Sequence, residues 1–215
     1  MSAPEMNQAN LLVELFVEEL PPKALKKLGE SFASQMFEEL KSRGLVGGEE
    51  KVTSYASPRR LAVHVCNVFA TAPDQEIKKK LMPVSVALDG NGKPTEAFKK
   101  SAAKVGRADL AEMWPNAVDG SDQLYIANDG KADAIFFRSM AKGTSLQVGL
   151  EGALEDAMAK LPIPKVMTYP LADGWTTVNF VRPVHGLIAL HGADIVPVSV
   201  LGLTAGRNTQ GHRFE

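Results

Sequence analysis

Residues 11–44 read LLVELFVEELPPKALKKLGESFASQMFEELKSRG, and this stretch joins a nearly continuous apolar run to a segment with helical periodicity. The run Leu11–Val17, interrupted by one glutamate, predicts a buried strand rather than a half-exposed one. Two prolines then suit the entry to a helix. Apolar side chains recur every three or four residues along that helix, at Leu25, Leu28, Phe32, Met36 and Leu40. Gly44 is expected to end it as a left-handed cap.

Two further strands are predicted directly after this helix. Residues 52–56 and 61–68 both look extended, and the second strand alternates an apolar face with a more polar one. Their connection, Ser57–Arg60, is a turn that holds two adjacent guanidinium groups, those of Arg59 and Arg60. The first third of the chain is therefore expected to form a small sheet with one packed helix.

The last third of the chain repeats this mixture of elements. A helix is predicted from about Ser145 to Lys160, where Pro162 stops it. Residues 187–201 resemble a hairpin with its turn at 191–194. Strands and helices are interleaved without the regular alternation of a doubly wound sheet. We therefore predict an α+β fold with mixed or antiparallel sheets and packed helices.

The middle of the chain has a different character and is expected to form a small inserted lobe. Prolines and glycines break its pattern, and Asp89–Gly92 is a strong turn signal. Thr95 offers an N-cap for a short helix that Gly106 ends, and Leu124–Ala127 indicates a strand. The apolar face of that helix consists of Phe98, Ala102 and Val105.

The predicted organisation is a main body, residues 8–72 together with 145–215, interrupted by a basic lobe at 73–144. From Lys78 to Arg107 there are eight basic and two acidic residues, a local excess of six positive charges. The rest of the chain then sums to minus seven. This asymmetry favours a segment that meets a polyanion, attached to a body that does not. A solvated lysine-rich face is the alternative explanation.

The overall composition is that of an ordinary soluble globular protein. Of the 215 residues, 45% are hydrophobic and 23% charged, and 24 basic side chains stand against 25 acidic ones. This balance argues against nucleic-acid binding over the whole surface. The single cysteine excludes an internal disulfide, and no run of 18 apolar residues exists to span a membrane. Met1–Asn10 lacks the pattern of a secretory signal, so we expect a cytoplasmic protein.

A search for catalytic and cofactor-binding patterns finds none. Gly90–Lys93 lacks the remaining glycine and the serine or threonine of a phosphate-binding loop. His64 and Cys66 share a strand face, but no second pair lies at ligand spacing, and Cys66 is expected to be a small buried hydrophobe. Glu18 and Glu19 precede a helix, so we interpret them as carboxylates that interact favourably with the helix dipole rather than as general acids or bases. We therefore expect no catalytic, cofactor-binding or metal-ligating residue in this chain.

Five stretches are weak motifs singly but specific in this order. They are LVE with EELPPKAL (12–14 and 18–25), SPRRLAV (57–63), LPIPKVM (161–167), FVRPVH (180–185) and TQGHRF (209–214). Together they resemble the N-terminal part of the beta subunit of bacterial heterotetrameric glycyl-tRNA synthetases, over residues 11–214. Phe16-Val17 departs from the Gly-Thr pair usual in the family, and Thr168-Tyr169 departs from a basic residue and an aromatic one. Family chains are also several times longer.

The resemblance implies a division of labour between subunits. In this family the alpha subunit binds ATP and glycine and forms the adenylate, and the beta subunit serves mainly tRNA recognition. The reaction is ATP-dependent attachment of glycine to tRNA(Gly), with ATP bound by the partner alpha subunit and not by this chain. A heterotetramer of two alpha and two beta chains is implied, with no membrane component. We expect this chain alone to be inactive as a glycine–tRNA ligase.

Candidate RNA-binding residues come from the motifs and from the basic segment. Arg59 and Arg60 suit phosphate binding because the turn presents two forked cations, and bracing of Glu18 or Glu19 explains the pair equally well. The lysine cluster from Lys78 onward is the stronger electrostatic candidate, because phosphate binding needs several charges on one surface.

The remaining candidates carry stronger alternative explanations. A solvated role is favoured for Lys165, and a buried ion pair is favoured over RNA contact for Arg182 and His185. His212 and Arg213 belong to the last family motif. The full set of candidates is Arg59, Arg60, Lys78, Lys79, Lys80, Lys99, Lys100, Lys104, Arg107, Lys165, Arg182, His212 and Arg213.

Two hypotheses therefore remain open for this chain. In the first it is an RNA-binding part of a ligase, and its affinity for tRNA falls steeply with salt as counterions are released. In the second it is an assembly module with no direct RNA contact, and any binding to RNA is weak and insensitive to the lysine cluster.

Overall fold

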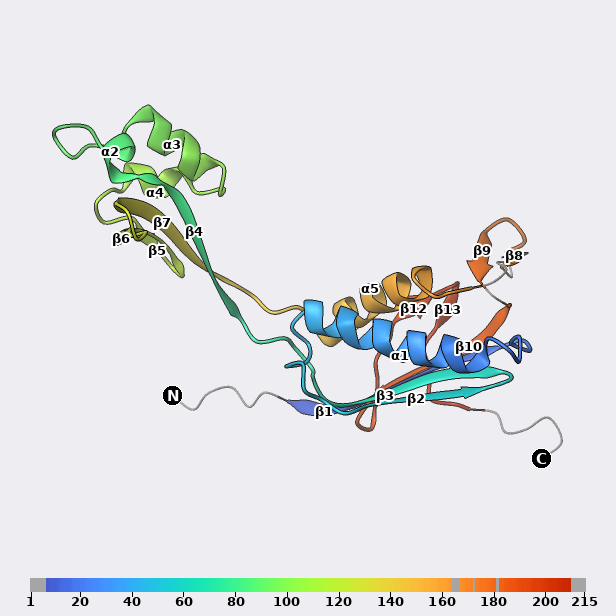
Figure 1. Cartoon of the computed structure of the whole chain (residues 1–215). Coiled ribbons are helices and arrows are strands. Elements are labelled where there is room, and N and C mark those ends of the chain that lie inside the picture. Colours follow the sequence, from blue (N-terminus) through green and yellow to red (C-terminus); the bar gives the residue numbers. More distant parts are fainter. Residues whose placement is uncertain (1–6, 164–166, 172, 181, 210–215) are drawn as a thin grey trace. The chain divides into compact units, whose positions relative to one another are not determined.

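The chain forms two compact units in this computed structural model. The described residues are 7–163, 167–171, 173–180 and 182–209. The main unit comprises residues 1–73 and 143–215, and the inserted unit comprises residues 74–142 (Figure 1). All pairs of named strands in the described residues are antiparallel, and helices pack on the sheets. The α+β class is confirmed.

A five-stranded sheet forms the frame of the main unit. Its strands are β1 (Gln8–Val17), β2 (Val52–Ser57), β3 (Arg60–Phe69), β10 (Val184–His191) and β11 (Asp194–Ile195). Their order is β11-β10-β1-β3-β2, so β1 lies at the centre. Leu11, Val13 and Leu15 are fully buried, whereas the side chains between them are half-buried. The expected strand is present but deeply buried on one face only, because the helices of this unit cover one face of the sheet.

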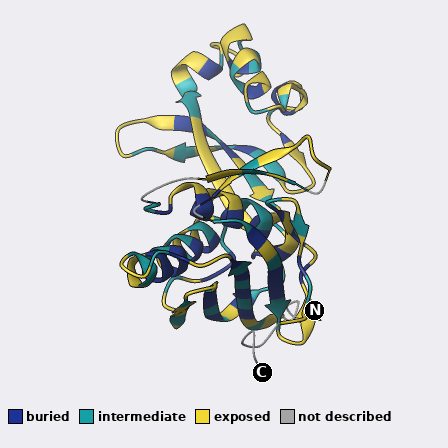
Figure 2. Cartoon of the chain, turned by 90° about the vertical axis from the view of Figure 1, so that its right-hand side faces the viewer, coloured by how far each residue is buried: buried dark blue, intermediate teal, exposed yellow. Residues whose placement is uncertain are grey.

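Two helices cover that face. They are α1 (Leu25–Ser42) and α5 (Leu146–Ala159), which lie beside each other (Figure 1). Both were predicted, and Gly44 has the left-handed conformation expected of a cap, with φ of 71°. Figure 2 marks the buried residues of these helices and strands in dark blue. No helix in the described part of the chain is long and apolar enough to cross a membrane.

Two short hairpins complete the main unit. They are β8 (Met167–Pro170) with β9 (Thr177–Phe180), and β12 (Ser199–Val200) with β13 (Leu203–Thr204). The hairpin expected over residues 187–201 is only partly right, because β10 and β11 pair over two residues before the chain leaves the sheet. Pro197 follows, and its missing N–H cannot extend the ladder. The next strand, β12, pairs forward with β13 instead.

The inserted unit has its own sheet and its own core. The elements are β4 (Gln75–Pro83), β5 (Val118–Asp119), β6 (Asp122–Asn128) and β7 (Asp133–Ala141), with α2 (Val84–Ala87), α3 (Glu96–Ala103) and α4 (Ala108–Glu112). The strand order is β4-β7-β6-β5. The predicted cap is present, since the Phe98 backbone N–H donates to Thr95 Oγ1 at 3.3 Å. The predicted strand at 124–127 lies within β6, whereas β4 and β7 were not predicted.

Candidate functional site

Described residues of the motif stretches meet at one end of the main unit's sheet. Strand β1 ends there at Val17, opposite Val184 at the start of β10, and Phe16 lies opposite Arg60 at the start of β3. A shallow cleft of about 500 Å³ opens beside them. We call it the motif cleft, and its lining residues are Glu18, Glu19, Leu20, Pro21, Pro22, Met167, Arg182 and Pro183.

Backbone hydrogen bonds hold the segment after β1 between two of the other motifs. The Val17 and Leu20 N–H groups donate to the carbonyls of Arg59 and Pro58, at 2.9 and 2.6 Å. The Glu18 N–H donates to the Pro183 carbonyl at 2.9 Å. These bonds fix the path of the Glu18–Leu20 backbone, so its two glutamates are presented at the cleft by three motifs together.

Arg60 is engaged within the fold. Its Nη1 donates to Glu14 Oε1 at 3.1 Å and to Thr209 Oγ1 at 3.2 Å. The guanidinium also lies 4.9 Å from the centre of the Phe16 ring, which is a cation–π distance. The bracing carboxylate is Glu14 rather than the expected Glu18 or Glu19, because β1 and β3 place Glu14 diagonally across from Arg60 on one sheet face.

Arg59 differs from its neighbour. It is exposed, and its side chain forms no hydrogen bond or ion pair with the described residues. Of the two adjacent guanidinium groups, that of Arg59 is therefore the one available to an outside anion.

Arg182 and His185 do not form the buried ion pair that the sequence favoured. Arg182 Nε donates to the Glu19 carbonyl at 3.0 Å, and its Nη1 lies 2.9 Å from Met167 Sδ. His185 Nε2 lies 2.8 Å from Glu18 Oε1, and both of those side chains are exposed. The expectation is wrong because the segment containing Arg182 lies along the rim of the cleft and not inside the apolar core.

The β8–β9 hairpin is tied to the same end of the sheet. The Val184 N–H donates to the Tyr169 hydroxyl oxygen at 3.2 Å. Burial raises the pKa of Tyr169, while this hydrogen bond lowers it by a smaller amount. At neutral pH the ring is therefore a neutral anchor that positions Met167 against Arg182.

The inserted unit is less basic than its first part suggests. Residues 74–142, all of which are described, contain 11 lysines and arginines and 10 aspartates and glutamates. The positive excess is therefore confined to the segment from Lys78 to Arg107, and the acidic residues before and after that segment nearly balance it.

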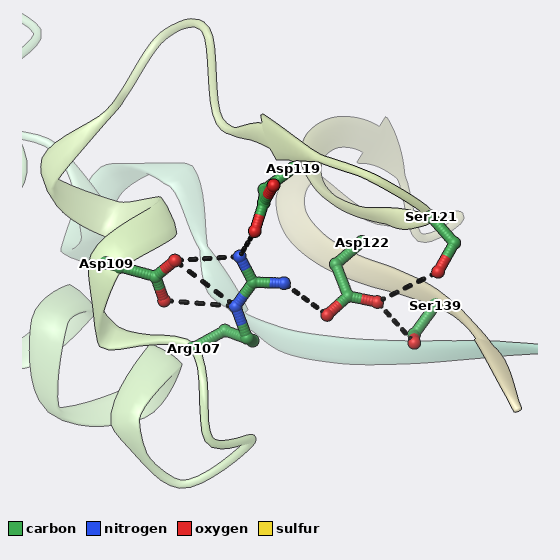
Figure 3. A network of polar contacts seen from close by, with 6 residues as sticks. All are labelled: Arg107, Asp109, Asp119, Ser121, Asp122 and Ser139. Carbon is green, nitrogen blue, oxygen red and sulfur yellow. Dashed lines mark hydrogen bonds and ion pairs between the residues drawn. The ribbon is translucent and has the colours of Figure 1, made fainter.

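Arg107 is surrounded by carboxylates (Figure 3). Its guanidinium donates to Asp109 at 2.7 Å, to Asp119 at 2.6 Å and to Asp122. The Ser139 hydroxyl donates to Asp122 at 2.5 Å, and this bond together with Arg107 lowers the pKa of Asp122. The carboxylates raise the pKa of Arg107 above its already high value. Three negative groups around one cation disfavour a phosphate there, so this network stabilises the fold.

The lysines of the inserted unit divide into paired and unpaired groups. Lys78 pairs with Glu76 at 2.8 Å. Lys80 pairs with Asp129, and Lys99 pairs with Glu96 at 3.1 Å. Three further candidates are exposed and form no ion pair within this fully described unit: Lys79, Lys100 and Lys104.

Lys165, His212 and Arg213 lie outside the described residues. Within the described ranges, no group of three or more His, Cys, Asp or Glu side chains could hold a metal ion. Cys66 is half-buried rather than fully buried.

Comparison with known proteins gives consistent matches along the chain. The family model described as "Glycyl-tRNA synthetase beta subunit" matches residues 11–215. The chain is 59% identical over 211 residues to the "Glycine--tRNA ligase beta subunit" of Dechloromonas aromatica (strain RCB), which covers 98% of this chain and 29% of the relative. The protein of the same name from Leptothrix cholodnii is 60% identical over 210 residues, covering 98% and 28%. The chain thus spans less than a third of the length of these relatives.

Proposed function

Because the chain belongs to the glycyl-tRNA synthetase beta-subunit family, we propose that it supports ATP-dependent attachment of glycine to tRNA(Gly) by contributing tRNA recognition. The observation that carries this proposal is the family match over residues 11–215. The chain contributes part of a larger beta subunit, and the complete subunit acts as a glycine–tRNA ligase within a complex.

The proposal assigns the small-molecule chemistry to another chain. ATP and glycine bind to the alpha subunit, which forms the adenylate, and the assembly is a cytoplasmic heterotetramer of two alpha and two beta chains. This chain by itself is then inactive in glycylation. The beta-subunit name of its relatives supports the presence of an alpha partner.

Four cations of the described residues support direct contact with RNA. Arg59, Lys79, Lys100 and Lys104 are exposed and carry no carboxylate partner in the described structure. An unpaired surface cation can bind a phosphate without first breaking an ion pair, so phosphate binding costs these residues less free energy than it costs the paired ones. By contrast, Arg60 and Arg107 would have to leave the contacts that hold the fold.

The test is the salt dependence of tRNA binding. Fluorescence anisotropy of labelled tRNA(Gly) would be followed for the chain at two salt concentrations. A variant carrying Lys79→Gln, Lys100→Gln and Lys104→Gln is the test protein. We expect weaker binding at low salt and a log–log salt slope shallower by up to about three, since each lost phosphate contact removes about one.

The matched control removes the same charge from the main unit. It carries Lys27→Gln, Lys41→Gln and Lys51→Gln, which are exposed lysines of that unit. We expect this control to bind tRNA like the unmodified chain. Equal and feeble binding by all three proteins, without dependence on salt, would contradict the proposal and favour an assembly module that makes no RNA contact.

A further inference from the structure

One face of the sheet in the inserted unit carries no helix. The short helices α2, α3 and α4 lie on the same side of the sheet (Figure 1). Leu124, Ile135 and Phe137 point to that side, where they pack with Phe98 and Leu110 in the core. Because side chains alternate along a strand, the residues between them point to the opposite face. The buried residues of the three helices all belong to that one core, so these helices do not cover the opposite face.

Two aromatic side chains stand together on this uncovered face. Tyr125 of β6 and Phe136 of β7 are register partners, and their ring centroids are 5.9 Å apart with an interplanar angle of 29°. Both rings are half-buried, and neither belongs to the core cluster of the unit. A stacked pair outside any core leaves part of each ring available to another flat group.

Three cations lie on the same face beside the rings. Lys80 is the register partner of Phe136, and Lys78 is the register partner of Arg138. The side chain of Lys80 is 44% exposed, that of Lys78 is 57% exposed and that of Arg138 is 47% exposed. A row of a lysine, a phenylalanine and a tyrosine therefore crosses β4, β7 and β6, with two more cations one step along the strands.

Ion pairs with two carboxylates hold these cations in place. Glu76 pairs with Lys78 at 2.8 Å and with Arg138 at 3.6 Å, and Asp129 pairs with Lys80. Three cations stand against two carboxylates, so the face retains a positive charge. The pairs of Lys78 and Arg138 with Glu76 are exposed and contribute little to stability, so a phosphate can replace Glu76 at low cost. The Lys80 pair is held more firmly, because the Asp129 side chain is only 17% exposed.

We propose that this face binds an unpaired stretch of RNA, with bases stacked on Tyr125 and Phe136 and phosphates held by Lys78, Lys80 and Arg138. Aromatic rings with interleaved cations on an open sheet are suited to single strands, because a duplex keeps its base faces covered. The proposal rests on the RNA recognition proposed above and specifies the form of RNA that this surface accepts. The stacked rings, with their tolerance of base identity, favour RNA over an acidic protein segment.

The experiment measures anisotropy of a labelled short single-stranded oligoadenylate, with a fully paired RNA duplex as the second probe. The test variant is Tyr125→Leu with Phe136→Leu, which keeps the surface apolar but removes both rings. We expect oligoadenylate binding to weaken about tenfold or more, because each lost base–ring stack contributes on that scale. Duplex binding should change far less.

Two controls guard against a structural explanation. Tyr125→Phe keeps the ring and is expected to bind oligoadenylate like the unmodified chain. Tyr55→Leu removes a tyrosine that is 55% exposed in the main unit and is also expected to have no effect. Circular dichroism and thermal unfolding of each variant report whether the inserted unit remains folded.

The outcomes separate this inference from the proposed function. Equal oligoadenylate binding by the double leucine variant and the unmodified chain, or no binding by either, would overturn the stacking face. If tRNA binding still depends on Lys79, Lys100 and Lys104, the proposed function stands without it. If oligoadenylate binding requires the rings but the chain does not bind tRNA, the proposed function is overturned and the stacking face stands. Loss of alpha-subunit binding in the leucine variant, with no oligoadenylate binding, would assign the face to a protein and overturn the inference.

Discussion

Arg107 donates to three aspartates that come from different elements of the inserted unit. Asp109 lies in α4, Asp119 in β5 and Asp122 in β6. One guanidinium therefore connects a helix to two strands, which its planar, five-donor geometry allows and a lysine could not reproduce. The same residue contributes to the local positive charge of the segment in sequence. Its role in the fold depends on contacts with Asp119 and Asp122, which the sequence alone does not predict.

We predict that Arg107→Gln lowers the stability of the inserted unit in a manner that depends on pH. Arg107 lowers the pKa of Asp109, and Ser139 and Arg107 lower that of Asp122, from an ordinary value of 3.8. A carboxyl group whose pKa is lower in the native state than in the unfolded state stabilises the native state fully above its unfolded-state pKa. This stabilisation is lost as the pH falls through the native-state pKa. The difference between the two proteins should be largest near neutral pH and shrink below about pH 4.

The measurement uses denaturant unfolding followed by Trp114 fluorescence in a Trp175→Phe background. Trp114 packs edge-to-face on Phe98 in the inserted unit, so its emission reports that unit. Lys104→Gln removes a charge without an ion pair and should unfold like the parent chain. An Arg107→Gln difference that stays constant from neutral to acidic pH would show that the network does not act through these carboxylates.

The contacts in the motif cleft show how far sequence could identify the site. The motif stretches were recognisable by their order along the chain, but their meeting point depends on strand register. Placing Val17 opposite Val184 and Phe16 opposite Arg60 brings together residues from three separate parts of the sequence. The choice of Glu14 as partner of Arg60 follows from that register, and no local pattern encodes it.

At the scale of elements, β4 gives the lysine triplet a second physical role. This strand is at an edge of its sheet, and most of its residues are exposed. Edge strands present unpaired backbone groups, and lysines on them discourage pairing with another chain. Lys78, Lys79 and Lys80 therefore protect an edge as well as supply charge.

We predict that Lys79→Val promotes self-association at high protein concentration. The substitution places a β-branched apolar residue on an exposed edge, which favours edge-to-edge pairing. Static light scattering against concentration measures the effect. Lys104→Val, the same change at the end of α3, should remain as monodisperse as the parent. Equal scattering by both variants would indicate that the edge of β4 is protected by something other than Lys79.

Sequence patterns predicted those elements whose apolar residues have a clear period. Helices α1 and α5 and strand β3 each present an apolar face to one core, so spacing alone identifies them. Strand β2 was predicted too, although none of its residues is fully buried. Strand β7 carries Ile135, Phe136 and Phe137 consecutively, because Phe136 faces the uncovered side while its neighbours face the helices. Strand β4 has three consecutive lysines in place of the alternating apolar and polar residues that predict a strand. Both strands were missed for these reasons.

At the scale of the whole molecule, the described residues form two separate hydrophobic cores. The core of the main unit and that of the inserted unit share no residue. The main unit is closed where the insertion leaves and returns, because the Ala72 N–H donates to the Thr144 carbonyl and the Leu146 N–H donates to that of Ala70, both at 2.9 Å. The insertion is therefore a contiguous segment attached at two adjacent points.

We predict that the inserted unit can be removed without unfolding the main unit. Joining residue 73 to residue 143 through a short glycine linker should leave a protein that unfolds cooperatively, because its core and the bonds at the junction are retained. Circular dichroism and a denaturant titration test this. The shortened protein should also lose salt-dependent binding to tRNA(Gly). Retained binding of full strength would move RNA recognition to the main unit.

The discontinuous main unit has a consequence for the order of events during synthesis. Strand β1 pairs with β3, which follows it closely, and with β10, which the ribosome adds only after the entire insertion. The inserted unit is contiguous, so it can form its core before β10 has been synthesised. Until then, one edge of β1 has no strand to pair with. A nascent chain that lacks β10 would thus leave one edge of the central strand unpaired, and an unpaired strand edge is prone to aggregation.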